Sequence, residues 1–313
     1  MSHRQAAPAL LVALGGNALI KKGQAGTITE QFANLAEPIA QIARLSRERR
    51  VLITHGNGPQ VGNLLLQQEC RQDLPRLPLE ILVAQTQGQI GYMIESSLDN
   101  QFMALGLEAW QPLVSLISYV VVDRDDPAFQ NPDKPIGPVL SDQQAAVAPY
   151  PVLRTAKGWR RVVASPRPLS IVEKREIKRL LDMDFIVICC GGGGIPVIRE
   201  GRRFAGVDAV IDKDLASARL GLDVGVQDFC MATDVPGAAL DFGRPGQRFL
   251  EDLSLAQARS LLAAGQFHPG SMEPKVRAAL EFLEGGGRRA LICSTGEIEA
   301  ALAGRAGTRF HKD

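Results

Sequence analysis

The stretch Ala9-Leu10-Leu11-Val12-Ala13-Leu14-Gly15-Gly16-Asn17 decides the fold, because an unbroken apolar run ends in a pair of glycines. The run is too short for a helix and lacks the polar alternation of a half-exposed strand. It is typical of a strand buried on both faces. Comparable short runs recur along the chain at 51–54, 113–122, 185–190, 226–232 and 290–293.

Amphipathic stretches lie between these apolar runs. In 32–49, apolar residues recur at Leu35, Ile39, Ile42 and Leu45, which is the spacing of one helix face. Residues 173–183 and 275–284 show the same pattern, and the second is followed by three glycines that stop a helix. Strand followed by helix, repeated, predicts an α/β fold with a mostly parallel sheet and helices on both faces.

Composition excludes several classes of function. The chain has 313 residues, with 35 Lys and Arg against 34 Asp and Glu, so its formal charge is +1. This balance argues against a nucleic-acid-binding protein, and no apolar stretch is long enough to predict a membrane span. The 5 cysteines show no CxxC pair and no zinc-ligand spacing, and we see no signal peptide before the first strand. We therefore expect a cytoplasmic protein in a reducing compartment.

Three of the apolar runs end in glycine clusters, at Leu14 to Asn17, His55 to Gln60 and Gly191 to Gly194. In a parallel sheet these clusters share one edge, where glycine lets backbone N–H groups approach an anion. One such cluster is more simply a tight turn, but three favour a shared phosphate site. The sequence has no GxxxxGK[ST], no GxGxxG at the four-glycine run and no GxSxG. His55 is better explained as a structural residue than as a catalytic base.

Two lysines stand where a helix N-terminus disfavours cations. Asp212 is a plausible N-cap that places Lys213 in the first turn, and Ser271 does the same for Lys275. A local rule that is broken twice in the same way indicates a functional site. An anion between the two helix starts would make both lysines favourable, although the neighbouring acids Asp214 and Glu273 provide a simpler neutralisation.

Residues 123–168 are rich in Pro, Asp and Gln and interrupt the strand–helix alternation. We expect an inserted protruding subdomain or lid within a single domain over 1–313, with a disordered linker as the alternative. Lys134 lies in this segment between prolines, as part of a lid or as a solvated loop residue. Lysines, backbone N–H groups and no clear general base together fit phosphoryl transfer, which depends on positioning and charge neutralisation.

Several collinear motifs extend this reading, and they cover nearly the whole chain. The chain resembles the carbamate kinases of the amino-acid kinase superfamily in the following stretches: Ala13 to Ala18, His55 to Gly62, Gln85 to Tyr92, Lys134 to Pro138, Arg160 to Val163, Gly191 to Val197, Val210 to Leu215, Pro269 to Met272 and Pro274 to Val276.

The resemblance implies a three-layer αβα fold, a homodimer, and reversible transfer between carbamoyl phosphate and ADP, giving ATP and carbamate, with Mg²⁺. Lys134, Lys213, Asp214 and Lys275 would be catalytic. The carbamate end would be held by Gly15, Gly16, Asn17, Gly56, Gly58 and Asn57, and the nucleotide by Thr233, Asp234 and Met272. The expected setting is ATP synthesis in arginine or nitrogen catabolism, with no metal ligand assigned to the chain.

The sequence departs from the family at Pro236 to Phe242, where Ala239 and Phe242 replace the usual tyrosines near the adenine. This change bears on nucleotide affinity and base preference. Two other functions stay open at this stage. One is another carboxylate kinase of the acetylglutamate type, and the other is a non-catalytic sensor that binds carbamoyl phosphate.

Overall fold

The computed structural model describes residues 7–21, 23–70, 73–107, 111–155 and 158–312, apart from the side chains of Asn17 and Pro138. Its main sheet has eight strands in the order β15-β17-β16-β12-β1-β2-β9-β3. All neighbours pair in parallel except β16 with β17. These strands are β1 (Ala9–Leu14), β2 (Arg50–His55), β3 (Leu113–Ser115), β9 (Ile186–Ile188), β12 (Asp228–Thr233), β15 (Asp252–Ser254), β16 (Arg289–Ser294) and β17 (Thr308–His311).

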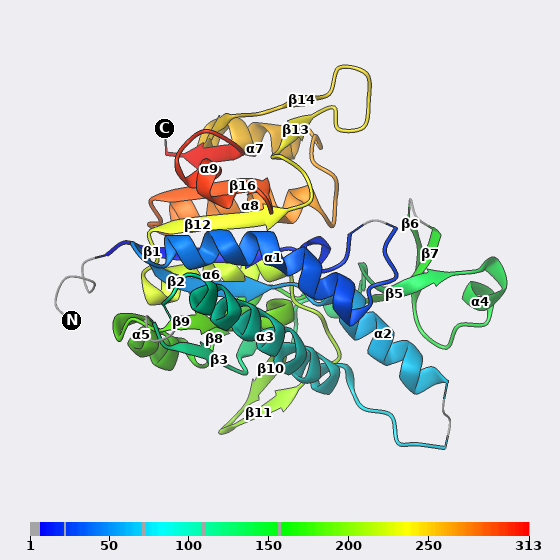
Figure 1. Ribbon diagram of the computed structural model, residues 1–313. Coiled ribbons are helices and arrows are strands. Elements are labelled where there is room, and N and C mark those ends of the chain that lie inside the picture. The colour runs from blue at the N-terminus through cyan, green and yellow to red at the C-terminus, as the bar shows by residue number, and fades with distance from the viewer. Residues whose placement is uncertain (1–6, 22, 71–72, 108–110, 156–157, 313) are drawn as a thin grey trace.

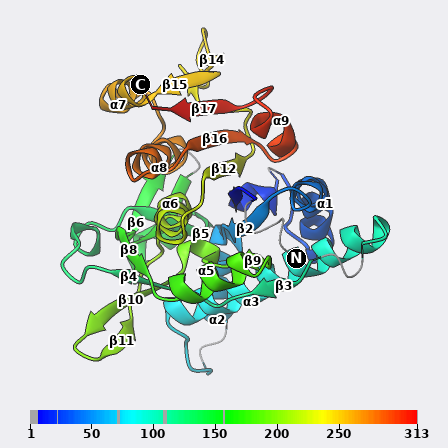
Figure 2. The same ribbon diagram turned by 90° about the vertical axis from the view of Figure 1, so that its left-hand side faces the viewer.

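Helices cover both faces of this sheet, so the predicted α/β fold with three layers is confirmed (Figure 2). Residues of one strand serve both layers alternately: Leu11 and Ala13 face one core, and Leu10 and Val12 face the other. The first core is closed by α5 (Lys174–Asp182), α6 (Lys213–Val224), α7 (Leu255–Ala263) and α8 (Met272–Glu284), and the second by α1 (Ile28–Leu45), α3 (Leu79–Ala104) and α9 (Ile298–Leu302).

Two smaller sheets adjoin the main one. The four-stranded sheet β11-β10-β4-β8 comprises β4 (Tyr119–Val122), β8 (Pro168–Ile171), β10 (Ile195–Glu200) and β11 (Arg203–Gly206). The two-stranded ribbon pairs β13 (Ala239–Leu240) with β14 (Arg248–Phe249). The described residues also form three short 3₁₀ turns: η1 (Gly16–Ala18), η2 (Pro127–Phe129) and η3 (Gly191–Gly193).

The segment that interrupts the alternation forms an antiparallel sheet of β5 (Lys134–Leu140), β6 (Val152–Thr155) and β7 (Gly158–Val163), with the short α4 (Asp142–Ala146). It projects beside α2 (Gly58–Glu69) at the end toward which β1 and β12 point (Figure 1). Ile136 and Val163 of this sheet pack with Val61 of α2 in a third apolar cluster. The described part of the segment is thus folded rather than a disordered linker, while its division from the rest of the chain stays a prediction.

The prediction of one strand over residues 113–122 was wrong, because this run forms two strands. The run from Leu113 to Val122 divides into β3, in the main sheet, and β4, in the four-stranded sheet. The break is held by Gln87 of α3, whose amide oxygen accepts from Ser118 N at 2.9 Å and whose Nε2 donates to Ser118 O at 3.2 Å. The apolar sequence of this run does not indicate that the chain passes from one sheet to the other within it.

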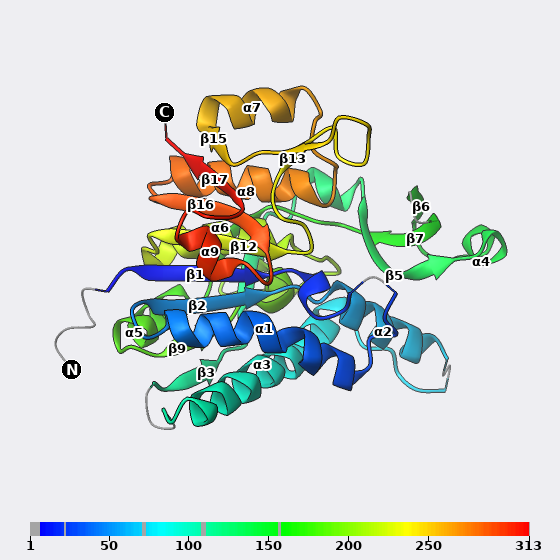
Figure 3. The same ribbon diagram turned by 45° about the horizontal axis from the view of Figure 1, so that its top comes forward.

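Helix starts follow the expected local chemistry only in part. Asp212 caps α6 by accepting from the N–H of Asp214 and Leu215. Ser271 stands at the N-cap of α8 but makes no side-chain capping bond. Helices α1 and α3 lie side by side on one face (Figure 3). Among the helices that the structure describes, none is long and apolar enough to cross a membrane.

Candidate active site

The three glycine clusters meet at one edge of the main sheet, as the sequence predicts. Gly15 follows β1 and donates its N–H to Ala232 O of β12 at 2.9 Å. Gly56 follows β2, and a Cβ placed on it would lie 2.9 Å from Gly16 N. The loops after β1 and β2 are therefore in backbone contact, a distance that glycine alone permits.

The four-glycine run joins this edge from β9. A Cβ on Gly192 would lie 2.2 Å from Nδ2 of Asn57, and one on Gly193 would lie 2.4 Å from Ile211 O. Both glycines also have positive φ, at 67° and 88°. The run therefore links the loop after β2 to the segment that leads into α6.

Asn57 and Gly58 stand at the start of α2. Asn57 is buried and does not cap its own helix; its Nδ2 instead donates to Thr86 Oγ1 of α3 at 2.8 Å. Thr86 in turn donates to Val83 O. Gly58 is exposed. Asn17 belongs to η1, next to Gly16, but its side chain lies outside the described residues.

Lys213 and Lys275 share one carboxylate. Lys213 Nζ lies 2.5 Å from Oδ1 of Asp214, and Lys275 Nζ lies 3.0 Å from its Oδ2. Asp214 is 3% exposed. Of the two acids expected to neutralise the lysines, Asp214 pairs with both, whereas Glu273 pairs with Arg277. The starts of α6 and α8 are thus drawn together around one buried charge.

The electrostatics of this group favour the charged forms of Asp214 and Lys275. Burial alone would raise the pKa of Asp214, but the charges of Lys213 and Lys275 overcome it and lower that pKa. Burial lowers the pKa of Lys213 against the opposing effect of Asp214. The pKa of Lys275 is raised despite burial, because Asp214 and Asp212 both favour its charged form.

Lys134, the first residue of β5, reaches the same group from the projecting sheet. Its Nζ lies 2.7 Å from Oδ2 of Asp212. The structure therefore brings together all four residues predicted to be catalytic. Asp212 was expected only as a helix cap, so its second partner was missed.

The residues expected at the nucleotide lie next to the lysines. Thr233 ends β12 and is buried, and its hydroxyl donates to Oδ1 of the exposed Asp234 at 3.2 Å. Asp234 contributes to the raised pKa of Lys275, so its charge lies near that amine. Met272 begins α8 and is half-buried against the core.

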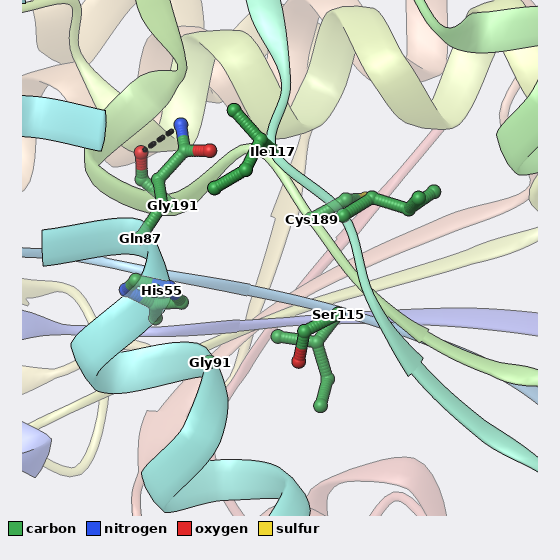
Figure 4. Close-up of a pocket in the computed structure, with 10 residues that line it drawn as sticks. His55, Gln87, Gly91, Ser115, Ile117, Cys189 and Gly191 are labelled. Atoms are coloured by element: carbon green, nitrogen blue, oxygen red, sulfur yellow. Dashed lines mark hydrogen bonds between the residues drawn. The ribbon is translucent and has the colours of Figure 1, made fainter. Parts of the chain in front are cut away.

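His55 lines a small cavity of about 80 Å³ (Figure 4). Figure 4 shows Gln87 beside it, with Nε2 donating to Gly191 O at 3.1 Å. Burial lowers the pKa of His55 to about 4. A neutral, enclosed imidazole is in keeping with the structural role expected for it. Gln87 and Thr86, which hold the glycine loops from α3, lie in the stretch Gln85 to Tyr92 that resembles the family, but no role was predicted for them.

Ion pairing also limits how a metal ion is held. Asp212 and Asp214 are both engaged by lysines, and the described residues contain no group of three His, Cys, Asp or Glu side chains arranged for a metal. Mg²⁺ in kinases is bound largely through substrate phosphates and one or two carboxylates. The site fits an ion that is carried by the nucleotide.

Comparisons with known proteins agree with this geometry. The amino acid kinase family model matches residues 8–294. The carbamate kinase of Thermococcus kodakarensis is 44% identical, over 97% of this chain and 99% of that protein. The carbamate kinase of Haemophilus influenzae is 42% identical over 97% of this chain and 96% of that protein.

Solved structures lead to the same group. Carbamate kinase from Giardia lamblia bound to citric acid superposes with a TM-score of 0.92 at 39% identity, covering 99% of this chain and 100% of the other. The same enzyme bound to AMP-PNP gives a TM-score of 0.89 with the same coverage. The chain belongs to the amino acid kinase family and, within it, to the carbamate kinases.

Proposed function

We propose that this protein catalyses the reversible transfer of a phosphoryl group between carbamoyl phosphate and ADP, giving ATP and carbamate. The observation that carries the proposal is the carboxylate of Asp214, which holds Lys213 and Lys275 at the edge where the glycine loops meet. Two fixed cations suit the anionic phosphoryl end of the substrate, and backbone N–H groups suit the carbamoyl oxygens, which gain negative charge as carbamate leaves.

Phosphoryl transfer requires little covalent chemistry from the protein itself. An oxygen of the ADP β-phosphate attacks phosphorus, the bond from phosphorus to the carbamate oxygen breaks, and carbamate leaves with the electron pair. Lys213 and Lys275 neutralise the transferring group, and Asp214 keeps the two amines from repelling each other. No proton need be removed from the nucleophile, which accords with a site whose nearby His55 is buried and neutral.

Carbamate is small, so its pocket needs few side chains. Gly16 and Gly58 would supply backbone N–H groups. Gly15 and Gly56 already donate theirs to Ala232 O and Leu14 O, so they would serve by letting the backbone approach the substrate closely. Asn57 would face the same group while Thr86 fixes its amide. Asn17 is assigned to this end by resemblance. Close contact between the loops, such as that of Gly56 with Gly16, supports a pocket that admits no larger acid.

The nucleotide would lie over Thr233, Asp234 and Met272, beside Lys275. The Giardia lamblia relative binds the ATP analogue AMP-PNP, which supports nucleotide use here. Mg²⁺ would arrive with the nucleotide phosphates and neutralise part of their charge. In the 236–242 stretch, the aromatic residue available to a base is Phe242, which is 55% exposed.

The wider setting follows from resemblance and composition. We propose a cytoplasmic homodimer that makes ATP from carbamoyl phosphate in arginine or nitrogen catabolism. The free cysteines suit a reducing compartment. Exposed large apolar side chains such as Tyr92, Ile117 and Phe204 suit an interface between two copies. Sedimentation velocity would test the dimer.

The experiment that tests the activity is a coupled assay of ATP formation from ADP, Mg²⁺ and carbamoyl phosphate, corrected for spontaneous decay of the substrate. A parallel series uses GDP. Turnover with ADP is the expected result. Turnover with GDP alone would assign the 236–242 change to base choice. Binding of carbamoyl phosphate without turnover in a folded protein would overturn the proposal in favour of a sensor.

A further inference from the structure

The ion pair between Lys134 and Asp212 joins two parts of the chain that no other charge pair among the described residues connects at this site. Lys134 opens β5 of the projecting sheet, and Asp212 immediately precedes α6. Their side chains are 23% and 13% exposed, so the pair is largely removed from solvent but a substrate could still reach it.

The two oxygens of Asp212 have different tasks. Oδ1 accepts the backbone N–H of Asp214 at 2.9 Å and of Leu215 at 3.3 Å, which is the capping bond of α6. Oδ2 accepts from Lys134 Nζ at 2.7 Å. One carboxylate therefore fixes the lid lysine directly to the helix start that carries Lys213 and Asp214.

The surrounding charges keep Asp212 available for this contact. Burial alone would raise the pKa of Asp212, but Lys134, Lys275 and Lys213 together lower it well below its usual range. The helix N-terminus of α6 adds partial positive charge on the same side. Asp212 is thus anionic near neutral pH.

The apolar contacts of the projecting sheet do not by themselves aim the lysine. Ile136 and Val163 hold the sheet against Val61, but a lysine side chain keeps several rotatable bonds beyond that anchor. An amine that is held before the substrate arrives loses less freedom during the reaction.

We infer, on the basis of the proposed function, that Asp212 is a positioning residue that holds Nζ of Lys134 at the phosphoryl end of the site, ready for the transferring group. Asp212 acts through Lys134 and does not itself contact the substrate. Its role in catalysis is separate from its role as the cap of α6.

The test uses Asp212→Asn and Asp212→Ser, because asparagine and serine cap helices about as well as aspartate. Asparagine keeps the shape but loses the charge, and serine is too short to reach Lys134. Both variants should lower kcat about tenfold. Their KM for ADP should stay within about twofold and their thermal unfolding close to that of the parent. Glu284→Gln, which removes an exposed ion pair with Arg259, is the matched control.

A double-mutant cycle with Lys134→Ala decides how Asp212 acts. If it acts through Lys134, Asp212→Asn should cause no further loss of kcat in the Lys134→Ala background. An equal tenfold loss in both backgrounds would overturn the inference, because Asp212 would then act through Lys213, Lys275 or the helix. Unchanged or raised kcat in Asp212→Asn would also overturn it. Asp212 would then serve only to cap α6, or its ion pair with Lys134 would slow the reaction.

A second readout separates this inference from the proposed function. Hydrogen exchange of the β5 and β7 amides should be faster in Asp212→Asn than in the parent protein, whether or not the parent turns over. Equal exchange would overturn the positioning role. Absence of turnover in the parent protein would overturn the proposed function alone. Full activity of Lys134→Ala would overturn the inference while leaving the carbamate kinase activity in place.

Discussion

The side-chain amide of Asn57 is held by the hydroxyl of Thr86, 2.8 Å away, rather than by the helix that Asn57 begins. The contact fixes which end of the amide faces the glycine loops. It also joins α3 to the edge of the sheet where the substrate would bind. A residue that contacts no substrate thus sets the orientation of one that would.

Replacing Thr86 with valine keeps the shape of the side chain and removes the acceptor. Asn57 Nδ2 is buried, so the free energy of unfolding should fall by about 1–3 kcal/mol. The amide would then be free to turn, and KM for carbamoyl phosphate should rise while KM for ADP stays unchanged. Steady-state kinetics and denaturant unfolding measure the two effects. Thr86→Ser, which keeps the hydroxyl, should behave like the parent, and an equal loss in both variants would contradict the prediction.

Lys275→Ala and Lys213→Ala should each lower kcat by about 10²–10³, because each removes one cation from the transferring phosphoryl group. The fold should survive, since Asp214 keeps one of its two lysine partners. The coupled ATP assay measures kcat, and circular dichroism checks the fold. Arg277→Ala, on the same face of α8 as Glu273, removes an exposed ion pair and serves as the control. Normal turnover in either lysine variant would refute the site assignment.

Gly62→Ala should impair catalysis although alanine favours helices. A Cβ on Gly62 would lie 2.5 Å from the Cα of Gly137, so β5 and its Lys134 would have to move. We expect kcat to fall about tenfold or more, without the gain of about 1 kcal/mol that Gly→Ala gives in an open helix. The matched control is Gly88→Ala in α3, where a Cβ meets nothing within 4 Å. Retained activity in Gly62→Ala would mean that the projecting sheet can shift without cost.

Stability should fall on acidification partly through His55. Its pKa is about 4 in the folded protein and about 6.5 in the unfolded chain, because burial disfavours the charged ring. The stabilisation is complete above about pH 6.5 and is lost as the pH falls toward 4, by about 3 kcal/mol. Unfolding free energies of the parent and His55→Gln, measured from pH 7 to pH 4.5, should converge as the pH falls. His311→Gln is the control, and parallel curves for His55→Gln and the parent would refute the low pKa.

Much of the sheet could be predicted because β1, β2, β12 and β16 are buried on both faces, which makes their sequences almost continuously apolar. Helix α3 was not predicted. It buries polar residues such as Thr86 and Gln87 on the side toward the glycine loops, so its sequence has no single apolar face. The same polar residues hold Asn57 and Gly191.

The site was partly predictable for a different reason. Lys213 and Lys275 attracted attention because each opposes the dipole of its own helix, a purely local signal. The pairing of Lys134 with Asp212 had no such signal, since the two residues are 78 positions apart. Capping chemistry accounts for one oxygen of Asp212 and says nothing about the other.

The pairing of β1 with β12 sets an order on the assembly of the protein during synthesis. Ala9 bonds to Gln227, 218 positions later, and Leu10 lies opposite Asp228. A ribosome must therefore deliver more than two-thirds of the polypeptide before the first strand gains its second neighbour. Until then the N–H of Gly15, in the loop after β1, lacks its acceptor Ala232 O. The edge of the sheet where a nucleotide would bind is then not yet formed. Such distant pairing closes slowly, so ligand affinity should appear as one of the last events of folding.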